Sequence, residues 1–497
     1  MAAEVVAHTA LSRRSVFRAA TLLGLGLAGG SATSACSNSS ISAQSPARQF
    51  LSRGRYFIAQ RGASDEAPEH TLAAYSRIAD RGAEAISVAV HRTRDGILVC
   101  HEDPTLSRTS GQNIAIADVT HDELTNHPVD LTRWVGPDWG LHPIPTFSEV
   151  LERLGKRAVL FVESKDPEAT TDVIGAVTAK QLGGTTVFTQ PFTAREGESA
   201  ARKAGLTICT YFSSHATGAE IDEAADGSDA IGIFAGVRRE NERQQTSIQS
   251  AVATGKPVIA WSVNRRSQLP YLAETGVRGF MSSSWSYVAG PSEPSPHDTF
   301  STGRIAPGDL AGNNSSSAAP EWGPNGSILL ATGASPQSIS MGSMCPVRAA
   351  PYVITVEAQF GAAPPLASDH LAVVIGRDDD SAYRLGAVSP GTTQSQLVVL
   401  RSTGDLELRS IPEGNALSIL QSSVAANKPV VGQWLTLRII VKPDSVTAEC
   451  DSGQEPEPEP TTVSAPRTAF GGYFTLARNY SGANAQASFR NISVAYR

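Results

Sequence analysis

The chain has 497 residues, which is more than one ordinary hydrophobic core accommodates and enough for two domains with tails. Apolar residues make up 41% of the chain and charged residues 18%, and the net charge of -7 is spread along the sequence, so charge gives no reason to expect nucleic acid or an anionic membrane surface as a partner. No apolar run is long enough for a membrane-spanning helix, so we expect no transmembrane span.

The N-terminus has the pattern of an export signal. Residues 12–18, Ser-Arg-Arg-Ser-Val-Phe-Arg, precede a mildly apolar stretch at residues 19–30 that is too short for a membrane anchor. An arginine pair before such a stretch is typical of a twin-arginine signal, which directs folded proteins out of the cytoplasm. The sequence therefore predicts a signal peptide at residues 1–35 and an extracellular or cell-surface location.

Two ways of processing the signal remain open at Cys36. Residues 33–36, Thr-Ser-Ala-Cys, resemble a degraded lipobox, in which Cys36 would be lipidated, but they also suit an ordinary signal peptidase. Residues 36–54 are then either a polar tether to a lipid anchor or a frayed N-terminal tail. Farther along the chain, Cys345 and Cys450 could pair outside the cytoplasm, although nothing in the sequence shows that they do.

The next region, residues 55–290, alternates short apolar runs with amphipathic stretches. Eight strands alternating with helices predict a parallel sheet closed into a (β/α)8 barrel. The predicted strands are 56–60, 85–90, 159–163, 186–189, 206–211, 230–234, 258–263 and 279–282. Helix-like stretches lie between them at 71–81, 146–154, 168–182, 195–204 and 266–274.

Six short motifs follow one another along this predicted barrel. They are I-A-Q-R-G-A at 58–63, A-P-E-H-T-L-A-A-Y at 67–75, V-H-R-T-R-D-G at 90–96, H-E-D-P-T-L-S-R-T at 101–109, V-E-S-K at 162–165 and W-S-V-N at 261–264. In order and type they resemble the glycerophosphodiester phosphodiesterase family, whose typical forms are A-H-R-G, A-P-E-N-T-L-x-A-F, D-V-H-x-T-x-D-G, H-D-x-T-L-x-R-T, I-E-x-K and W-T-V-N. The resemblance covers roughly half of the chain, and the colinear order makes chance a poor explanation.

This resemblance implies a barrel of the PLC-like phosphodiesterase type that hydrolyses glycerophosphodiesters. A Ca²⁺ or Mg²⁺ ion held by carboxylates neutralises the phosphate oxygens in such a mechanism. Two histidines move protons to and from the attacking and leaving oxygens, and an arginine binds the phosphate as a fork. The groups lie at the C-terminal ends of the barrel strands.

Four positions carry over the family's functional residue types. By resemblance, Arg61 is the phosphate-binding arginine, His101 is the second catalytic histidine, Glu163 is a metal carboxylate and Lys165 is the lysine of I-E-x-K. We expect Arg61, Lys165 and His101 to converge with Glu163 alongside. Glu163 and Lys165 are two residues apart on one strand face and can form an ion pair.

Three positions depart from the family pattern. Gln60 stands in place of the first histidine, and a glutamine cannot take up a proton near neutral pH. Ser87 and Ala89 replace the Glu and Asp of the metal pair E-x-D, on one face of the second strand. Hard cations prefer several charged oxygen ligands, so the sequence predicts that Ca²⁺ or Mg²⁺ binding is weak or absent. Neither Glu84, on the opposite strand phase, nor Asp103, an ordinary member of its motif, is expected to replace the lost ligands.

The composition changes after the predicted barrel. Residues 291–327 are rich in Pro, Ser, Asn and Gly and are predicted to be linker and loops. Residues 328–497 contain period-two segments at 353–358, 434–439 and 488–494, which indicate an antiparallel β-sandwich. This region weakly resembles concanavalin- or laminin-G-type jelly rolls, a resemblance that implies glycan binding without assigning any residue to it.

Two functions therefore remain open. The first is an exported phosphodiesterase-like enzyme with weak or no catalysis, acting on a phosphodiester or another phosphate-bearing small molecule. The second is a non-catalytic cell-surface protein whose barrel is an anion pocket and whose sandwich binds a glycan or another partner. A self-satisfied polar cluster left by ancestry would also explain the surviving residues. His91 is expected to be structural, and His70, His121, His127 and His142 are expected in surface or loop roles.

Overall fold

The computed structural model describes residues 45–235, 242–290, 321–323, 326–331, 339–340, 347, 349–361, 366–380, 394–412, 418–423, 428–451, 459–479 and 486–496. The predicted signal peptide, Cys36, Cys345 and most of the predicted linker lie outside these residues. Among the helices that the structure describes, none is both long and apolar enough to cross a membrane.

Eight parallel strands form a closed barrel, as the sequence predicts. Each strand pairs with the next around the ring, and β1 closes it by pairing with both β9 and β2. The short strand β3 (Leu98–Cys100) adds to β2 in antiparallel orientation. The barrel strands are β1 (Tyr56–Ala59), β2 (Ala85–Arg92), β4 (Val159–Ser164), β5 (Thr186–Pro191), β6 (Thr207–Phe212), β7 (Ala230–Phe234), β8 (Val258–Trp261) and β9 (Gly279–Ser282).

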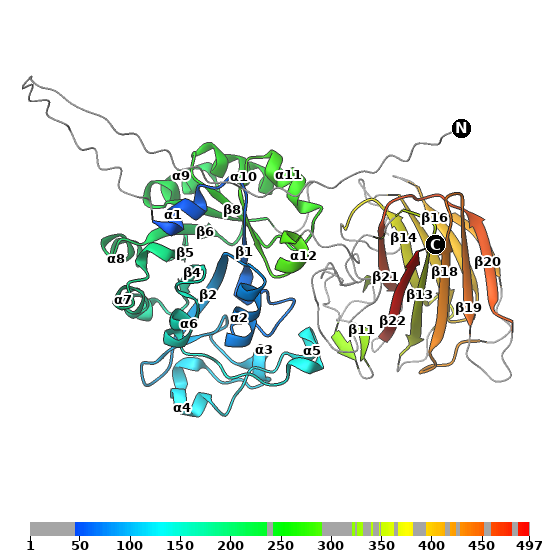
Figure 1. Ribbon diagram of the computed structural model, residues 1–497, viewed down its shortest axis with the longest axis horizontal. Helices are drawn as coiled ribbons and strands as arrows, with labels where there is room; N and C mark the ends of the chain where they lie inside the picture. The colour runs from blue at the N-terminus through cyan, green and yellow to red at the C-terminus, as the bar shows by residue number, and fades with distance from the viewer. Residues whose placement is uncertain are drawn as a thin grey trace, which may run out of the picture. The chain divides into compact units, whose positions relative to one another are not determined.

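Helices surround the barrel strands (Figure 1). Helix α6 shows why they form there, because Thr146 and Glu149 close a capping box at its start while Phe147, Val150, Leu151 and Leu154 are buried. The α-helices of the barrel are α2 (Leu72–Asp80), α3 (Ser107–Ser110), α4 (His121–Leu124), α5 (Thr132–Val135), α6 (Phe147–Leu154), α7 (Thr170–Ala179), α8 (Glu198–Lys203), α9 (Gly218–Gly227), α10 (Glu242–Ala253), α11 (Gln268–Glu274) and α12 (Trp285–Ala289). Short 3-10 turns are η1 (Gln60–Gly62), η2 (Ile116–Asp118), η3 (Pro137–Trp139), η4 (Pro167–Ala169) and η5 (Gly183–Thr185).

The segment predicted to be a polar tether ends in a packed helix. Helix α1 (Pro46–Leu51) begins with proline at its first position, and the side chain of Ser45 caps it. Phe50 and Leu51 are buried in one cluster with Tyr56 and other barrel residues. The tether prediction is therefore wrong for residues 46–51, because burial of these apolar side chains fixes the helix against the barrel.

The C-terminal region consists of two antiparallel sheets, which confirms the predicted sandwich. One sheet has the order β10-β11-β22-β13-β18-β19-β20 and the other the order β12-β21-β14-β15-β16-β17. The strands are β10 (Glu321–Gly323), β11 (Ser327–Ala331), β12 (Ile339–Ser340), β13 (Tyr352–Phe360), β14 (His370–Arg377), β15 (Ser395–Arg401), β16 (Leu406–Ile411), β17 (Ser418–Ser423), β18 (Leu435–Val441), β19 (Ser445–Asp451), β20 (Thr461–Pro466), β21 (Tyr473–Asn479) and β22 (Gln486–Tyr496). Strand β10 lies in the segment predicted to be linker.

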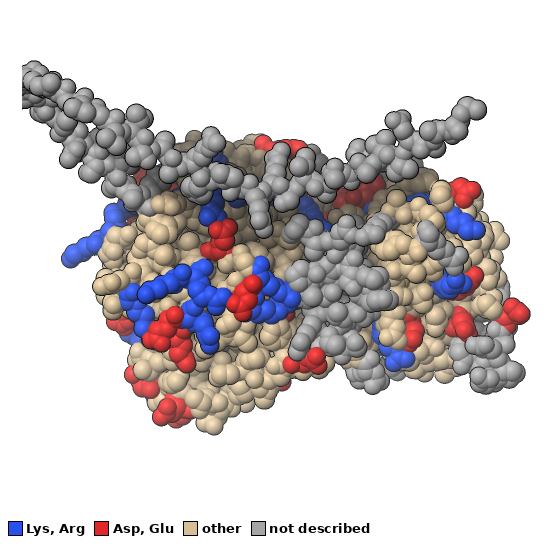
Figure 2. All heavy atoms as spheres, viewed as in Figure 1, with Lys and Arg blue, Asp and Glu red and all other residues tan. Residues whose placement is uncertain are grey.

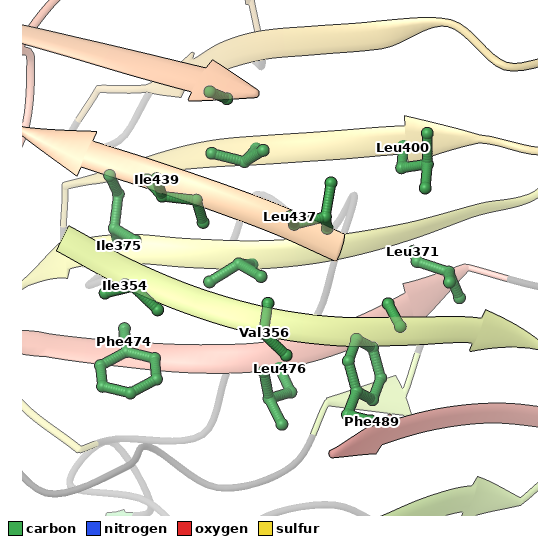
Figure 3. Packing of buried hydrophobic residues seen from close by; sticks show 14 of the residues in the cluster. Ile354, Val356, Leu371, Ile375, Leu400, Leu437, Ile439, Phe474, Leu476 and Phe489 are labelled. Carbon is green, nitrogen blue, oxygen red and sulfur yellow. The ribbon is translucent and has the colours of Figure 1, made fainter. Parts of the chain in front are cut away.

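A single apolar core joins the two sheets of the sandwich. Side chains from β13 and β18 meet those from β14 and β21, as Figure 3 shows for Ile354, Ile439, Ile375 and Phe474. Alternate residues of each strand supply this core, which is why the period of two was visible in the sequence.

Candidate functional site

A pocket lies at the C-terminal end of the barrel strands, where such barrels keep their sites. Its empty volume is about 690 Å³, part of which is open to solvent. Charged groups stand on one part of its wall, and aromatic and apolar side chains form the rest. It is lined by Gln60, Arg61, Ser87, Val88, Ala89, Glu102, Phe161, Glu163, Lys165, Thr189, Cys209, Tyr211, Gly232, Ile259, Trp261 and Met281.

The turn after β1 carries Gln60 and Arg61 into the pocket. Arg61 has a positive φ of 55°, and its backbone N–H donates a hydrogen bond of 2.8 Å to Ser87 Oγ on β2. Gly62 follows with φ 81°. A left-handed conformation is uncommon for a residue with a side chain, so the hydrogen bond to Ser87 contributes to holding the arginine in place.

The amide of Gln60 is held by two hydroxyl groups. Its Oε1 accepts hydrogen bonds from Ser262 Oγ at 2.8 Å and from Ser283 Oγ at 3.2 Å. These contacts fix the side chain at the position where the resemblance implies the first histidine. The group can orient a ligand through hydrogen bonds, but it cannot exchange a proton near neutral pH.

The carboxylate of Glu102 is the centre of the charged groups in the pocket. Its Oε1 lies 3.1 Å from Arg61 Nη2 and 2.9 Å from Lys165 Nζ, and its Oε2 lies 3.5 Å from His70 Nε2. Burial alone would raise the pKa of Glu102. The hydrogen bond with His70 and the charges of Arg61 and Lys165 outweigh burial and hold the pKa well below its usual range. Glu102 is therefore an ionised acceptor between two cations.

The ammonium group of Lys165 lies between two carboxylates. Its Nζ is 2.9 Å from Glu102 Oε1 and 3.0 Å from Glu163 Oε1, which confirms the ion pair expected between Lys165 and Glu163. The hydroxyl of Tyr211 donates a further hydrogen bond of 2.6 Å to Glu163 Oε1. Burial works against the charge of Lys165, but the two carboxylates outweigh it and raise its pKa. Burial raises the pKa of Glu163, and Lys165 and Tyr211 offset that only in part.

His101 lies outside the pocket lining, and the expected convergence of His101 with Arg61 and Lys165 is not found. Its ring is buried, with Nδ1 2.7 Å from the carbonyl oxygen of Asp103 and Nε2 2.8 Å from Thr109 Oγ1. Burial is the main cause that lowers the pKa of His101 to about 4. The next residue, Glu102, lies in the bend that follows β3, and its side chain lines the pocket.

The motif itself accounts for this one-residue difference. In H-D-x-T-L-x-R-T the histidine precedes the first threonine by three positions. Counted back from Thr105, the Asp of the motif falls on Asp103 and the histidine falls on Glu102. The assignment of the second catalytic histidine to His101 was therefore one residue too early, and neither Gln60 nor Glu102 retains the family's histidine.

A second ion cluster supports Arg61 from the side. The buried carboxylate of Glu69 lies 3.4 Å from Arg61 Nη1 and accepts hydrogen bonds of 2.9 and 2.6 Å from Arg108. His70 is buried beside it, and its Nδ1 lies 2.6 Å from the hydroxyl of Tyr75. Of the two roles expected for His70, the loop role holds because the residue lies in a turn, and the surface role is wrong because its ring is buried. A signal was present, because the family motif has Asn here, and both Asn and His tolerate the positive φ of 55° found at this position.

The residues present do not fit a divalent cation. Ser87 Oγ already accepts the backbone N–H of Arg61, and Ala89 offers no ligand atom. The carboxylates of Glu102 and Glu163 are both paired with Lys165, which lies between them, and Glu102 is also paired with Arg61. No group of three or more His, Cys, Asp or Glu side chains that could hold a metal ion occurs within the described ranges. Ca²⁺ and Mg²⁺ need several oxygen ligands, and this arrangement supplies an ammonium group instead.

Comparison with known proteins points to one family. The Glycerophosphoryl diester phosphodiesterase family matches residues 61–284. A glycerophosphodiester phosphodiesterase of Caldanaerobacter subterraneus is 36% identical over 103 residues, which cover 21% of this chain and 42% of that protein. One of Bacillus subtilis is 31% identical over 119 residues, covering 22% and 40%. The chain thus spans less than half the length of the curated relatives it matches.

Solved structures are also similar to this chain. The crystal structure of a glycerophosphodiester phosphodiesterase from Thermotoga maritima has a TM-score of 0.39 and 20% identity, covering 46% of this chain and 95% of that one. A phosphodiesterase from Oleispira antarctica in complex with the product sn-glycerol-3-phosphate has a TM-score of 0.40 and 21% identity, covering 46% and 93%. The family match at residues 61–284, the ordered motifs and the closed parallel barrel make the barrel of this chain similar to the glycerophosphoryl diester phosphodiesterase family.

Proposed function

We propose that this chain is an exported, phosphodiesterase-like protein in which metal-dependent hydrolysis is weak or lost. The barrel pocket then serves to bind a small phosphate-bearing molecule, the ligand class that the family and its relatives suggest. One observation carries the proposal: at the two positions on β2 where the family has metal carboxylates, Ala89 offers no ligand atom and Ser87 Oγ already accepts the backbone N–H of Arg61 at 2.8 Å. Without carboxylates at these two positions, the pocket lacks the ligands for the divalent ion that supplies Lewis acidity in phosphodiester hydrolysis of this kind.

The proton-transfer groups support the same conclusion. Gln60 cannot act as an acid or a base, and Glu102 is ionised and paired with two cations. Glu102 has no proton to give to a leaving oxygen, and as a base it would have to break both ion pairs first. Loss of a single outer-shell partner commonly costs about 10–100-fold in metal affinity or activity, so loss of two inner carboxylates and both histidines should cost more.

A direct assay tests this proposal. The purified chain is incubated with glycerophosphocholine and either Ca²⁺ or Mg²⁺, and release of glycerol 3-phosphate is followed. We expect no turnover above a blank without protein, and no heat of binding when CaCl₂ or MgCl₂ is titrated into the protein at millimolar concentration. Robust metal-dependent turnover that EDTA abolishes would overturn the proposal.

Export is proposed from the arginine pair and the apolar stretch of residues 12–30 alone. A reporter fused to the first 35 residues should leave the cytoplasm, and the double change Arg13→Lys, Arg14→Lys should retain it there. Mass spectrometry of the mature protein decides between lipidation of Cys36 and release, since a lipidated protein begins at Cys36 and carries acyl mass. An unprocessed reporter that stays in the cytoplasm would contradict export.

A further inference from the structure

The positive groups of the pocket are already occupied by an anion of the protein itself. Arg61 and Lys165 both contact one oxygen of Glu102, at 3.1 and 2.9 Å, and His70 lies 3.5 Å from the other oxygen. A carboxylate with two oxygens held by a guanidinium, an ammonium and an imidazole is bound in the manner in which proteins bind phosphate oxygens. Glu102 therefore fills the place that a ligand phosphate would take.

The charge balance of the pocket wall shows what Glu102 does to an incoming anion. Arg61 and Lys165 carry two positive charges, and Glu102 and Glu163 carry two negative charges, so the four groups together are neutral. Without Glu102 the same wall would carry one net positive charge. A phosphate must therefore either displace the carboxylate or approach a site with no attraction for it.

The guanidinium of Arg61 also has a donor that no described residue uses. Its Nε is buried and has no hydrogen-bond partner among the described residues, while Nη1 contacts Glu69 and Nη2 contacts Glu102. A monodentate carboxylate contact thus leaves one donor unsatisfied. A phosphate group has more acceptor oxygens than a carboxylate and could bind Nε and Nη2 together as a fork.

We infer that Glu102 is an internal competitor for anions: its carboxylate occupies the position formed by Arg61 and Lys165, and a phosphate group binds there only by displacing it. This inference deepens the proposed function, because it names the residue that limits phosphate binding in the same pocket. In the site without ligand, Lys165 pairs with the carboxylates and Glu102 pairs with the positive groups. A cation or an anion must therefore displace one of these side chains in order to bind.

The test compares phosphate binding in the whole protein and its Glu102 variants. Inorganic phosphate and sn-glycerol 3-phosphate are titrated by calorimetry into the wild-type chain, Glu102→Ala and Glu102→Gln. We expect Glu102→Ala to bind both probes at least about tenfold more tightly than wild type, because couplings between charges in direct contact commonly reach or exceed that factor. Glu102→Gln should gain less, because the amide keeps the volume of the side chain while it removes the charge. Glycerol, which has no charge, should show no gain.

Two further variants show whether the gain comes from this site. Glu152→Ala removes an exposed carboxylate that pairs with Lys180 outside the pocket, so it changes the net charge equally and should leave phosphate affinity as in wild type. Adding Arg61→Ala to Glu102→Ala should abolish the gain. Circular dichroism and thermal melting confirm that each variant is folded, and if Glu102→Ala does not fold, Glu102→Gln is judged by the direction of its change.

The inference is overturned if the Glu102 variants bind phosphate no better than wild type, or if Glu152→Ala gains as much as they do. Hydrolysis of glycerophosphocholine by the wild-type chain is a separate measurement. Turnover would overturn the proposed loss of catalysis without touching the competition by Glu102, and absent phosphate gain would overturn the competition without restoring catalysis. The two failures are therefore distinguishable.

Discussion

The barrel and the sandwich each bury a carboxylate between two cations, and the two arrangements differ in where their members come from. In the sandwich, Glu407 accepts a hydrogen bond of 2.5 Å from Arg401 and another of 2.5 Å from Arg409, all three on the neighbouring strands β15 and β16. In the barrel, Glu102 joins side chains that follow β1 and β4. Ion pairs within one sheet are ordinary structural contacts, whereas convergence from distant segments at strand ends is what distinguishes a site.

The two regions also share a distribution of charge that has no single sign. On the face shown in Figure 2, basic and acidic side chains lie beside one another. The net charge of -7 is spread in the same way along the sequence. Long-range attraction therefore does not select a ligand, and recognition depends on the local groups of the pocket.

The two carboxylates should differ most in how much each contributes to the free energy of unfolding. Glu407→Ala leaves the buried Arg409 and the half-buried Arg401 without their carboxylate, and we expect a loss of about 3 kcal/mol or more in the free energy of unfolding. Glu102→Ala should cost less, because Arg61 keeps Glu69 and Lys165 keeps Glu163. Urea denaturation followed by circular dichroism measures both. Equal losses would mean that Glu102 is as structural as Glu407.

Restoring the family's groups should have the next largest effect. The combined change Gln60→His, Ser87→Glu, Ala89→Asp and Glu102→His returns two carboxylates and both histidines to the pocket and releases Lys165 from one partner. We expect Ca²⁺ affinity to rise at least about 100-fold, since charged oxygen ligands dominate the binding of hard cations. Calorimetry with CaCl₂ measures the gain. The same titration of Glu102→His alone is the control, and a lack of gain in the combined variant would mean that the backbone of the pocket no longer suits an ion.

The sequence predicted the barrel more fully than its site. Strand and helix positions were visible because their apolar periods are local, and the capping box at Thr146 and Glu149 marked the start of α6. Helix α10 has only a weak apolar period, because its run Glu-Arg-Gln-Gln-Thr-Ser has few apolar positions. The spacing of Ala47, Phe50 and Leu51 is a signal for helix α1, but the polar composition of the segment before it indicates a tether instead.

The sequence alone places the second histidine of the family one residue too early, at His101 instead of Glu102, and backbone geometry explains why one residue matters. His101 and Glu102 are neighbours, but one is buried against Thr109 while the other contacts Arg61 and Lys165. Because the chain bends after β3, a shift of one residue changes the direction of the side chain, so a histidine in the right motif can still point away from the pocket. Only the tertiary arrangement shows that an acid after β3 approaches the end of β4. Neither Glu84 nor Asp103, the two acids weighed from the sequence, lines the pocket, whereas Glu102 does.

Buried histidines should make both regions less stable in mild acid. Burial lowers the pKa of His101 in the barrel and of His370 in the sandwich to about 4, from an ordinary value near 6.5. The unfolded chain therefore binds these protons first, and stability should be constant above about pH 6.5 and fall as the pH drops from there towards 4. We expect a loss of about 2 kcal/mol for each residue between pH 7 and pH 5, about 4 kcal/mol as a sum over both.

Substitution separates the two contributions to this acid sensitivity. His101→Gln should flatten the pH dependence of barrel unfolding, and His370→Gln should flatten that of the sandwich. Urea denaturation at a series of pH values measures each slope. A slope that neither variant alters would assign the effect to other groups.

The smallest effect should come from the hydroxyl of Ser87, which tests whether the residue has a structural use in place of the lost metal ligand. Ser87→Ala leaves the backbone N–H of Arg61 without its acceptor, and the expected loss of stability is about 1 kcal/mol. The turn after β1 positions both Gln60 and Arg61, so the phosphate affinity of a Glu102→Ala protein should fall when Ser87→Ala is added. Thr447→Ala, which removes a hydroxyl contact with Ser464 in the sandwich, is the matched control, because it should leave phosphate binding unchanged. If Ser87→Ala changes neither stability nor phosphate binding, the Ser87 hydroxyl has no structural use. If Ser87→Ala weakens phosphate binding, the serine that stands in place of a metal carboxylate also holds Arg61 in the position on which the pocket depends.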